Sequence, residues 1–306
     1  MIKLLKLWDK FWFSRFDPIS ACVFRIAIGF LLLIYFIALY PNWELFYARD
    51  GIISLTDPEI AKVTLDKWSL FYLTDKILPV RIYYWLGITG IIMLIVGFKT
   101  RISTVFIWIL IFSMTNRTRV IVNGEHLVLE TILFFSCFLP LGYYLSVDRW
   151  LDKKKNNKVN LKEPSIWPLR LIQINIILIY VFSTYYKITT DPAWLNGESL
   201  YWTITNKMWG RFPYPELFYN WDSILCKILT YSSLFIEGSF PILIWFKKLR
   251  FSLVIVMIIF HLSIILIVPG VLYFNLAMIC SFFVFIPQDV IRNFLGRFKS
   301  VKQLLI

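Results

Sequence analysis

Apolar residues in this chain occur in long runs, and short polar stretches separate one run from the next. A helix that crosses a bilayer needs about 20 mainly apolar residues, and these runs approach or reach that length. They are too long to be the stripes that a single soluble core would bury. The pattern predicts about eight membrane-spanning helices, over residues 19–40, 81–98, 102–118, 126–147, 166–187, 223–246, 250–268 and 271–287.

Both ends of the chain are predicted to form amphipathic helices that lie along the membrane surface. In residues 1–16, one helical face carries aromatic and leucine side chains and the other carries lysines. The tail, residues 288–306, repeats this basic amphipathic pattern. We therefore expect one domain over residues 1–306, with a transmembrane core at 15–287.

The composition agrees with a membrane-embedded, all-α bundle. The chain is 58% hydrophobic and 19% aromatic, and only 17% of its residues are charged, which is unusually apolar for a soluble domain. A net charge of +13 could indicate nucleic-acid binding, but the basic residues form clusters between apolar runs and there is no phosphate-binding loop. We therefore expect no nucleic-acid partner. Four dispersed cysteines and two isolated histidines predict no metal site.

The positions of the basic clusters predict the orientation of the helices. Clusters at residues 99–101, 149–162, 247–250 and 292–302 all fall on one side when eight spans are counted from a cytoplasmic N-terminus. This satisfies the positive-inside rule. We expect a multi-pass protein of a bacterial cytoplasmic membrane, with both termini in the cytoplasm and anionic lipid against the basic clusters.

Two long segments fall on the opposite, outer side. Residues 41–80 contain a predicted helix start at Thr56–Asp57–Pro58–Glu59. Residues 188–222 are rich in aromatic side chains, and Asn196–Gly197 marks a turn. Because aromatic side chains favour the headgroup region, we expect both segments to fold back over the bundle as lids.

Ionisable and amide side chains inside the predicted spans are costly to bury, and each is a candidate for a functional site. They are Arg25, Glu130, Arg170, Gln173, Asn175, Lys227, Glu237 and His261, with Lys187 at the outer end of a span. Arg25 and Arg170 lie near the cytoplasmic ends of their helices. For these two we favour a structural role, as counter-ions to Glu130 or to lipid phosphate.

For three residues the sequence supports two interpretations. Glu237 precedes Gly238 and Pro241, which weaken the helix there and could open a cavity. His261 lies among aliphatic residues, either as a packing residue or as a functional group that needs a partner. Lys187 either extends to the membrane surface or, if aromatic residues cover it, acts as a neutral base.

Several stretches, in this order along the chain, resemble a known family. They are FRIAIGFLLLIY followed by YARDGI, then NRTRVIVNGEHLVLETILFFSCFLPLGYYLSVD, then RLIQINIILIYVFSTYYKITTDPAWLNGESLY, and finally IEGSFPILI followed by FHLSIILI. They resemble the membrane domain of vitamin K-dependent γ-glutamyl carboxylases, which occurs in bacteria as the horizontally transferred transmembrane (HTTM) domain. The resemblance runs from about residue 15 to residue 287.

The resemblance implies a specific chemistry at the outer membrane face. In such carboxylases a lysine deprotonates a reduced naphthoquinone, which reacts with O2 to give a strong base. This base removes a proton from a peptide glutamate, and CO2 adds to the carbanion. The sites implied here are catalytic Lys187, His126 and His261, and cofactor-binding Asn123, Glu237, Trp194 and Gln173.

Only a short tail follows the last predicted span, so we expect no large domain that captures a propeptide. Carboxylation of a docked protein is therefore less secure than quinol oxidation, although a lyase-type enzyme remains the favoured reading. The alternative is a non-catalytic membrane factor for maturation or export of a small secreted peptide, since short bacterial members resemble the sporulation-delaying toxin maturation factor. A generic transporter is less favoured, because no paired repeats with broken helices are visible.

Overall fold

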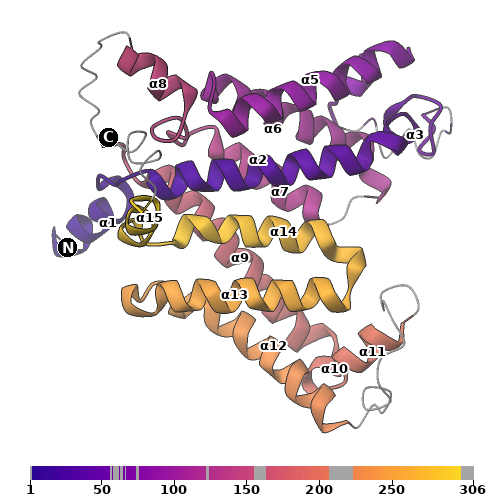
Figure 1. The fold of residues 1–306 in the computed structure, drawn as a ribbon. Helices are drawn as coiled ribbons and strands as arrows, with labels where there is room; N and C mark the ends of the chain where they lie inside the picture. The colour runs from indigo at the N-terminus through magenta and orange to yellow at the C-terminus, as the bar shows by residue number, and fades with distance from the viewer. Residues whose placement is uncertain are drawn as a thin grey trace. The chain divides into compact units, whose positions relative to one another are not determined.

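The computed structural model of the chain is built from helices (Figure 1). It describes residues 2–55, 57, 62, 65, 67–73, 76–121, 124–154, 163–206 and 223–297. Within these residues there is no β-strand, and an isolated bridge joins Arg15 and Ser165. Contacts between Cα atoms divide the chain into two units, Met1–Ile172 with Gln288–Ile306, and Gln173–Pro287.

In the first unit, α2, α5, α6 and α7 pack as successive neighbours, and the short α3 lies against α5. The helices of this unit are α1 (Ile2–Phe13), α2 (Ile19–Leu39), η1 (Tyr40–Asn42), α3 (Trp43–Tyr47), η2 (Leu70–Tyr72), α5 (Ile77–Val96), α6 (Thr100–Arg117), η3 (Arg119–Ile121), α7 (Gly124–Ser136), α8 (Val147–Lys154) and α15 (Gln288–Leu295). The helix α9 (Trp167–Thr190) begins in this unit and continues into the second.

In the second unit, α12 packs against α13, and α13 packs against α14. The short helices α10 and α11 both lie against α12. The bounds are α10 (Pro192–Leu195), α11 (Ser199–Thr205), α12 (Ile224–Leu243), α13 (Lys247–Ile267), η5 (Pro269–Val271), α14 (Leu272–Ser281) and η6 (Phe282–Phe285).

The predicted all-α fold is confirmed, and the structure contains candidate membrane-spanning helices. Among the described residues, four helices are long and apolar enough to cross a membrane, and the number rises to five if a bent pair counts as one span. These four are Ile19–Tyr47, Ile77–Val96, Trp167–Thr190 and Lys247–Ile267. Each of the eight predicted segments contains a helix, but the number of crossings stays a prediction.

One predicted span is shorter in the structure than the apolar run suggests. Helix α7 ends at Ser136, although apolar residues continue beyond it towards residue 147. The amides of Phe138 and Leu139 donate to the carbonyls three residues earlier, and Pro140 has no amide hydrogen with which to continue the ladder. The chain then turns, and Leu145 adopts a left-handed φ of 52°. The apolar run predicted a helix in this segment, but it did not predict the residue at which the helix ends.

The side chain of Arg25 donates hydrogen bonds to two backbone carbonyls of this turn. Arg25 is completely buried, and its guanidinium donates to the carbonyl of Leu141 at 3.0 Å and to that of Leu145. We expected Arg25 to reach the membrane surface or to pair with Glu130, and that prediction was wrong for this residue. Its partners are carbonyl groups that no helix satisfies, because the turn leaves them without an amide donor. Arg170, expected to act similarly, places its guanidinium 4.7 Å from the centre of the Phe11 ring.

An aromatic cluster lies around α3 and η2 in the first unit. Tyr47 stacks on Phe71 with ring centroids 4.8 Å apart, and Trp43 packs on both rings. Beside this cluster Arg117 is fully buried and donates to the carbonyl of Ala48, a role that the sequence did not suggest. Tyr72 donates to the carbonyl of Asn116 at 3.1 Å, and burial raises the pKa of its hydroxyl to about 12.

Two predicted elements, the helix start at residues 56–59 and the C-terminal tail, lie partly outside the described residues. The helix start at Thr56–Asp57–Pro58–Glu59 has only Asp57 within them. The amphipathic N-terminal helix is present as α1, and the tail is described up to residue 297, where it forms α15. Arg292 in α15 pairs with Asp17 and donates to the Tyr144 hydroxyl at 3.0 Å, so α15 is attached to the first unit.

Gly97 gives a test of the Arg25 contact. Its φ of 72° is left-handed, and a Cβ at this position would collide with the Arg25 guanidinium and with Cβ of Ser146. We predict that Gly97→Ala lowers the free energy of unfolding by about 2 kcal/mol, through backbone strain and displacement of Arg25. Thermal unfolding of the purified protein in detergent measures the loss. Gly97→Ala together with Arg25→Ala should cost less than the sum of the single changes, and strict additivity would contradict this contact.

Candidate functional site

The second unit contains a buried ion pair between α9 and α12. Lys187 lies near the end of α9, and its Nζ is 2.6 Å from both carboxylate oxygens of Glu237 in α12. The side chains are only 19% and 8% exposed. Next to Glu237, a Cβ on Gly238 would lie 3.2 Å from Thr184 of α9, so the glycine allows the two helices to approach closely.

Two further groups complete this ion pair. Ser183, one helical turn before Lys187, donates to Glu237 Oε2 at 3.0 Å. The ring of Trp194 lies 4.2 Å from Lys187 Nζ in a cation–π contact. Asp191 caps α10 by accepting from the amide of Ala193, and Pro192 starts that helix, which fixes where Trp194 points. The carboxylate of Glu237 and the face of the Trp194 ring are thus the two groups nearest to the Lys187 nitrogen, and both interact favourably with a cation.

A second cluster surrounds His261 in α13. Asn275 of α14 donates through its Nδ2 to the carbonyl of Val271 at 2.7 Å, which leaves its Oδ1 as an acceptor 2.6 Å from His261 Nδ1. His261 therefore carries its proton on Nδ1, and its Nε2 accepts from the Tyr180 hydroxyl at 2.6 Å. All three side chains are buried. His261 has the partners that a membrane interior demands, and it is neutral.

Both clusters line cavities that are partly open. A cavity of about 180 Å³ has Lys187 and Glu237 on one part of its wall and Tyr180 and His261 on another, with an apolar remainder formed by Ile179, Ile264, Val271, Phe274 and Met278. A second cavity of about 170 Å³ also includes Lys187 and Glu237, together with Trp194 and residues of α11. The ion pair therefore borders two small cavities.

Four of the predicted site residues come together in this unit: Lys187, Glu237, Trp194 and His261. Gln173 does not line either cavity; it donates to the carbonyl of Val284 at 2.8 Å. His126 lies in the first unit, where its Nε2 is 3.0 Å from the Tyr35 hydroxyl and its Nδ1 is 4.0 Å from Glu125. Asn123 lies outside the described residues.

Three residues of this site, Ser183, Tyr180 and Asn275, were not predicted from the sequence. Tyr180 and Ser183 precede Lys187 by seven and four residues, which places all three on one face of α9. That spacing was visible in the sequence. Asn275 was also visible, as an amide inside an apolar run, and its cost in a membrane should have marked it as a partner for His261.

Within the described residues, no group of three or more histidine, cysteine, aspartate or glutamate side chains could hold a metal ion. The polar groups of this site are instead one ammonium, one carboxylate, hydroxyl groups and a neutral imidazole. Such groups can bind a small hydroxyl-bearing molecule and exchange protons with it.

The model of the HTTM domain family matches residues 13–289 of the chain. The sporulation-delaying protein SdpB of Bacillus subtilis (strain 168) is 24% identical over 190 residues, which cover 60% of this chain and 57% of that protein. The chain thus spans little more than half the length of this curated relative. No solved structure matches the chain.

The ion pair leads to a prediction about stability. We expect Glu237→Ala to lower the free energy of unfolding by about 3 kcal/mol, because it leaves the Lys187 ammonium buried without its counter-charge. Replacing both residues, Lys187→Met with Glu237→Leu, should recover most of this loss, since no charge then remains. Thermal unfolding of the original protein, Lys187→Met, Glu237→Leu and the double variant completes a double-mutant cycle. Additive effects would show that the two side chains do not interact.

Proposed function

The chain belongs to the HTTM domain family, and we propose that it is an integral membrane enzyme that takes a proton from a reduced naphthoquinone held beside Lys187 and Glu237. The observation that carries this proposal is the buried ion pair on the walls of two cavities. A lysine and a carboxylate sharing protons in an apolar cavity suit base catalysis better than packing.

The residues of the site fit a reduced naphthoquinone. Such a molecule is a flat apolar ring system with hydroxyl groups, and the 180 Å³ cavity combines apolar walls with hydrogen-bonding groups at two places. Lys187, Glu237 and Ser183 would hold one hydroxyl, and Trp194 would close the outer side. When bound, the quinol supplies the electrons for reaction with O2, and CO2 is the second co-substrate if carboxylation follows.

The proton is handled by the ion pair. Burial penalises two separate charges, so a neutral pair, an amine beside a carboxylic acid, competes with the ammonium–carboxylate pair. In the neutral pair Lys187 Nζ has a free lone pair and can accept a proton from a hydroxyl in the cavity. The ammonium formed in this way remains next to the negative charge that its action creates, and so stabilises it.

In this proposal the His261 cluster orients the Tyr180 hydroxyl and does not take part in the reaction itself. Because Asn275 fixes the proton on Nδ1, His261 Nε2 holds the Tyr180 hydroxyl in one orientation on the cavity wall. Both nitrogens of the ring are engaged, so His261 acts in this proposal through Tyr180. His126, placed in the first unit, is not assigned a step.

The membrane arrangement completes the proposal. Eight helices cross a bacterial cytoplasmic membrane with both termini in the cytoplasm, and the site opens towards the outer face. The basic residues at Lys99 and in α8 support this orientation. The short helices α10 and α11, with their exposed Leu195 and Trp202, form part of an outer lid.

A second candidate function is a non-catalytic membrane factor for the maturation or export of a small secreted peptide. The similarity to the sporulation-delaying protein SdpB favours it. In that case the aromatic side chains of α10 and α11 would contact the peptide, and Lys187 would serve the structure alone.

The two candidates differ in their dependence on Lys187. We predict that Lys187→Arg lowers the rate of O2 consumption with a naphthoquinol at least 100-fold, because arginine stays protonated and cannot act as the base. The measurement uses the purified full chain and an oxygen electrode. Lys227→Arg, on α12 but outside both cavities, should leave the rate unchanged. Equal turnover by Lys187→Arg and the original protein would reject the base mechanism.

The orientation is tested by labelling. We predict that a cysteine at Thr190, at the end of α9, reacts with a membrane-impermeant maleimide added to intact cells, whereas a cysteine at Lys154 reacts only after the membrane is opened. The unmodified protein, with its buried or half-buried cysteines, supplies the background. Labelling of residue 154 in intact cells would place α8 outside and reject the eight-span count.

A further inference from the structure

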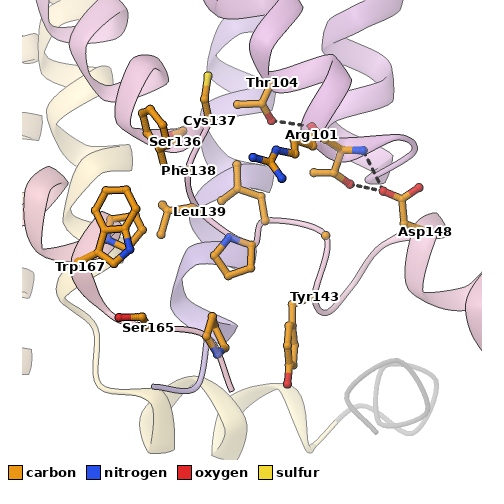
Figure 2. Close-up of a pocket in the computed structure, with 16 residues that line it drawn as sticks. Arg101, Thr104, Ser136, Cys137, Phe138, Leu139, Tyr143, Asp148, Ser165 and Trp167 are labelled. Carbon is orange, nitrogen blue, oxygen red and sulfur yellow. Dashed lines mark hydrogen bonds between the residues drawn. The ribbon is translucent and has the colours of Figure 1, made fainter. Parts of the chain in front are cut away.

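The first unit contains a larger cavity that the proposed function does not use. It has a volume of about 460 Å³ and is formed by the start of α6, the turn that follows α7, and the start of α9 (Figure 2). All of its lining residues belong to the first unit. Its walls combine one arginine, Arg101, with hydroxyl-bearing and aromatic side chains.

One polar wall of this cavity is fixed by Asp148. Its carboxylate accepts from the amides of Lys99 and Thr100 at 2.7 and 2.8 Å, and from the Thr100 hydroxyl at 2.6 Å. These bonds satisfy the amides at the start of α6 and use the carboxylate fully. Asp148 therefore holds the wall in place and does not pair with Arg101.

Arg101 is the polar group left for a ligand. Figure 2 shows its guanidinium among the lining residues, and no dashed line reaches it. Within the described part of the chain, no carboxylate forms an ion pair with it. A guanidinium presents several donors in a plane and binds phosphate oxygens in pairs. The basic residues Lys99, Lys153 and Lys154 at the same end of this unit add to the attraction for an anion.

One part of the cavity wall is apolar and leads away along α7. Phe138 lies 5.6 Å from Trp167 and 5.5 Å from Phe134, measured between ring centroids, and Phe134 lies 5.3 Å from Trp108. Phe138 and Phe134 are 45% and 39% exposed, so this row of rings is open along its length. A hydrocarbon chain that starts at the cavity would find a continuous apolar surface.

From this combination we propose that the cavity binds the phosphate headgroup of an anionic membrane lipid, with Arg101 on the phosphate and an acyl chain along Phe138 and Phe134. Free phosphate shares the headgroup chemistry but would leave the aromatic row uncovered. This site is separate from the Lys187 cavities and does not rest on the proposed function. A lipid bound in this cavity would occupy one defined position, whereas a basic surface alone would attract anionic lipids without fixing where they bind.

The test measures lipid retained by the purified full chain, using native mass spectrometry. The probes are phosphatidylglycerol, a diacylglycerol with the same acyl chains but no phosphate, and inorganic phosphate as a competitor. We expect phosphatidylglycerol to bind the original protein at least tenfold more tightly than the diacylglycerol does. Inorganic phosphate should not displace it. These arms use the unaltered protein and so do not depend on any variant folding.

Variants locate the site. We expect Arg101→Gln to weaken phosphatidylglycerol binding about tenfold, as loss of one charged hydrogen-bonding partner does, and Arg101→Lys to retain part of it. Lys248→Gln removes the same charge from α13, outside the cavity, and should change binding little. Unaltered binding by Arg101→Gln, or an equal loss in Lys248→Gln, would overturn the proposal. Displacement by inorganic phosphate would also overturn it, because the ligand would then be the free anion.

Discussion

Helices built to cross hydrocarbon must satisfy every polar group from within the protein, because no water is present there to form the missing hydrogen bonds. Several features of this chain follow from that requirement. Arg25 donates to carbonyls that the turn after α7 leaves without amide partners. His261 engages Asn275 and Tyr180 with its two nitrogens, and Lys187 meets the carboxylate of Glu237. The buried polar side chains thus come in sets, and each set joins helices that are apolar elsewhere.

The same requirement explains why an ion pair can exist between apolar helices. An isolated lysine would lose its proton or leave the apolar region, and an isolated glutamate would become neutral. Side by side, each of them has a partner of opposite charge. Two cavities border the pair, and the ring of Trp194 lies 4.2 Å from Lys187 Nζ.

The sequence predicted the helices well because long apolar runs have few other solutions in a membrane. It also predicted a functional role for Lys187, Glu237, Trp194 and His261, for Lys187, Glu237 and His261 from their unusual surroundings and for all four from the family resemblance. The positions of Tyr180 and Asn275 were visible in the sequence, but their contact with His261 forms only when three helices pack. The end of α7 was missed for a different reason, because hydrophobicity carries no information on where backbone hydrogen bonding stops. Likewise, only the folded turn shows why Arg25 is buried and does not reach a lipid headgroup.

The Arg25 contact also bears on how the protein is made. Arg25 and the carbonyl of Leu141 are 116 residues apart in the chain. At a synthesis rate of roughly 5–20 residues per second, Arg25 is synthesised about 6–23 s before Leu141. During that interval the arginine must be accommodated by lipid headgroups, by water or by the insertion machinery. The first span can insert before its partners exist, because it is strongly apolar. Arg25 forms its hydrogen bonds only after the turn that follows α7 has been synthesised.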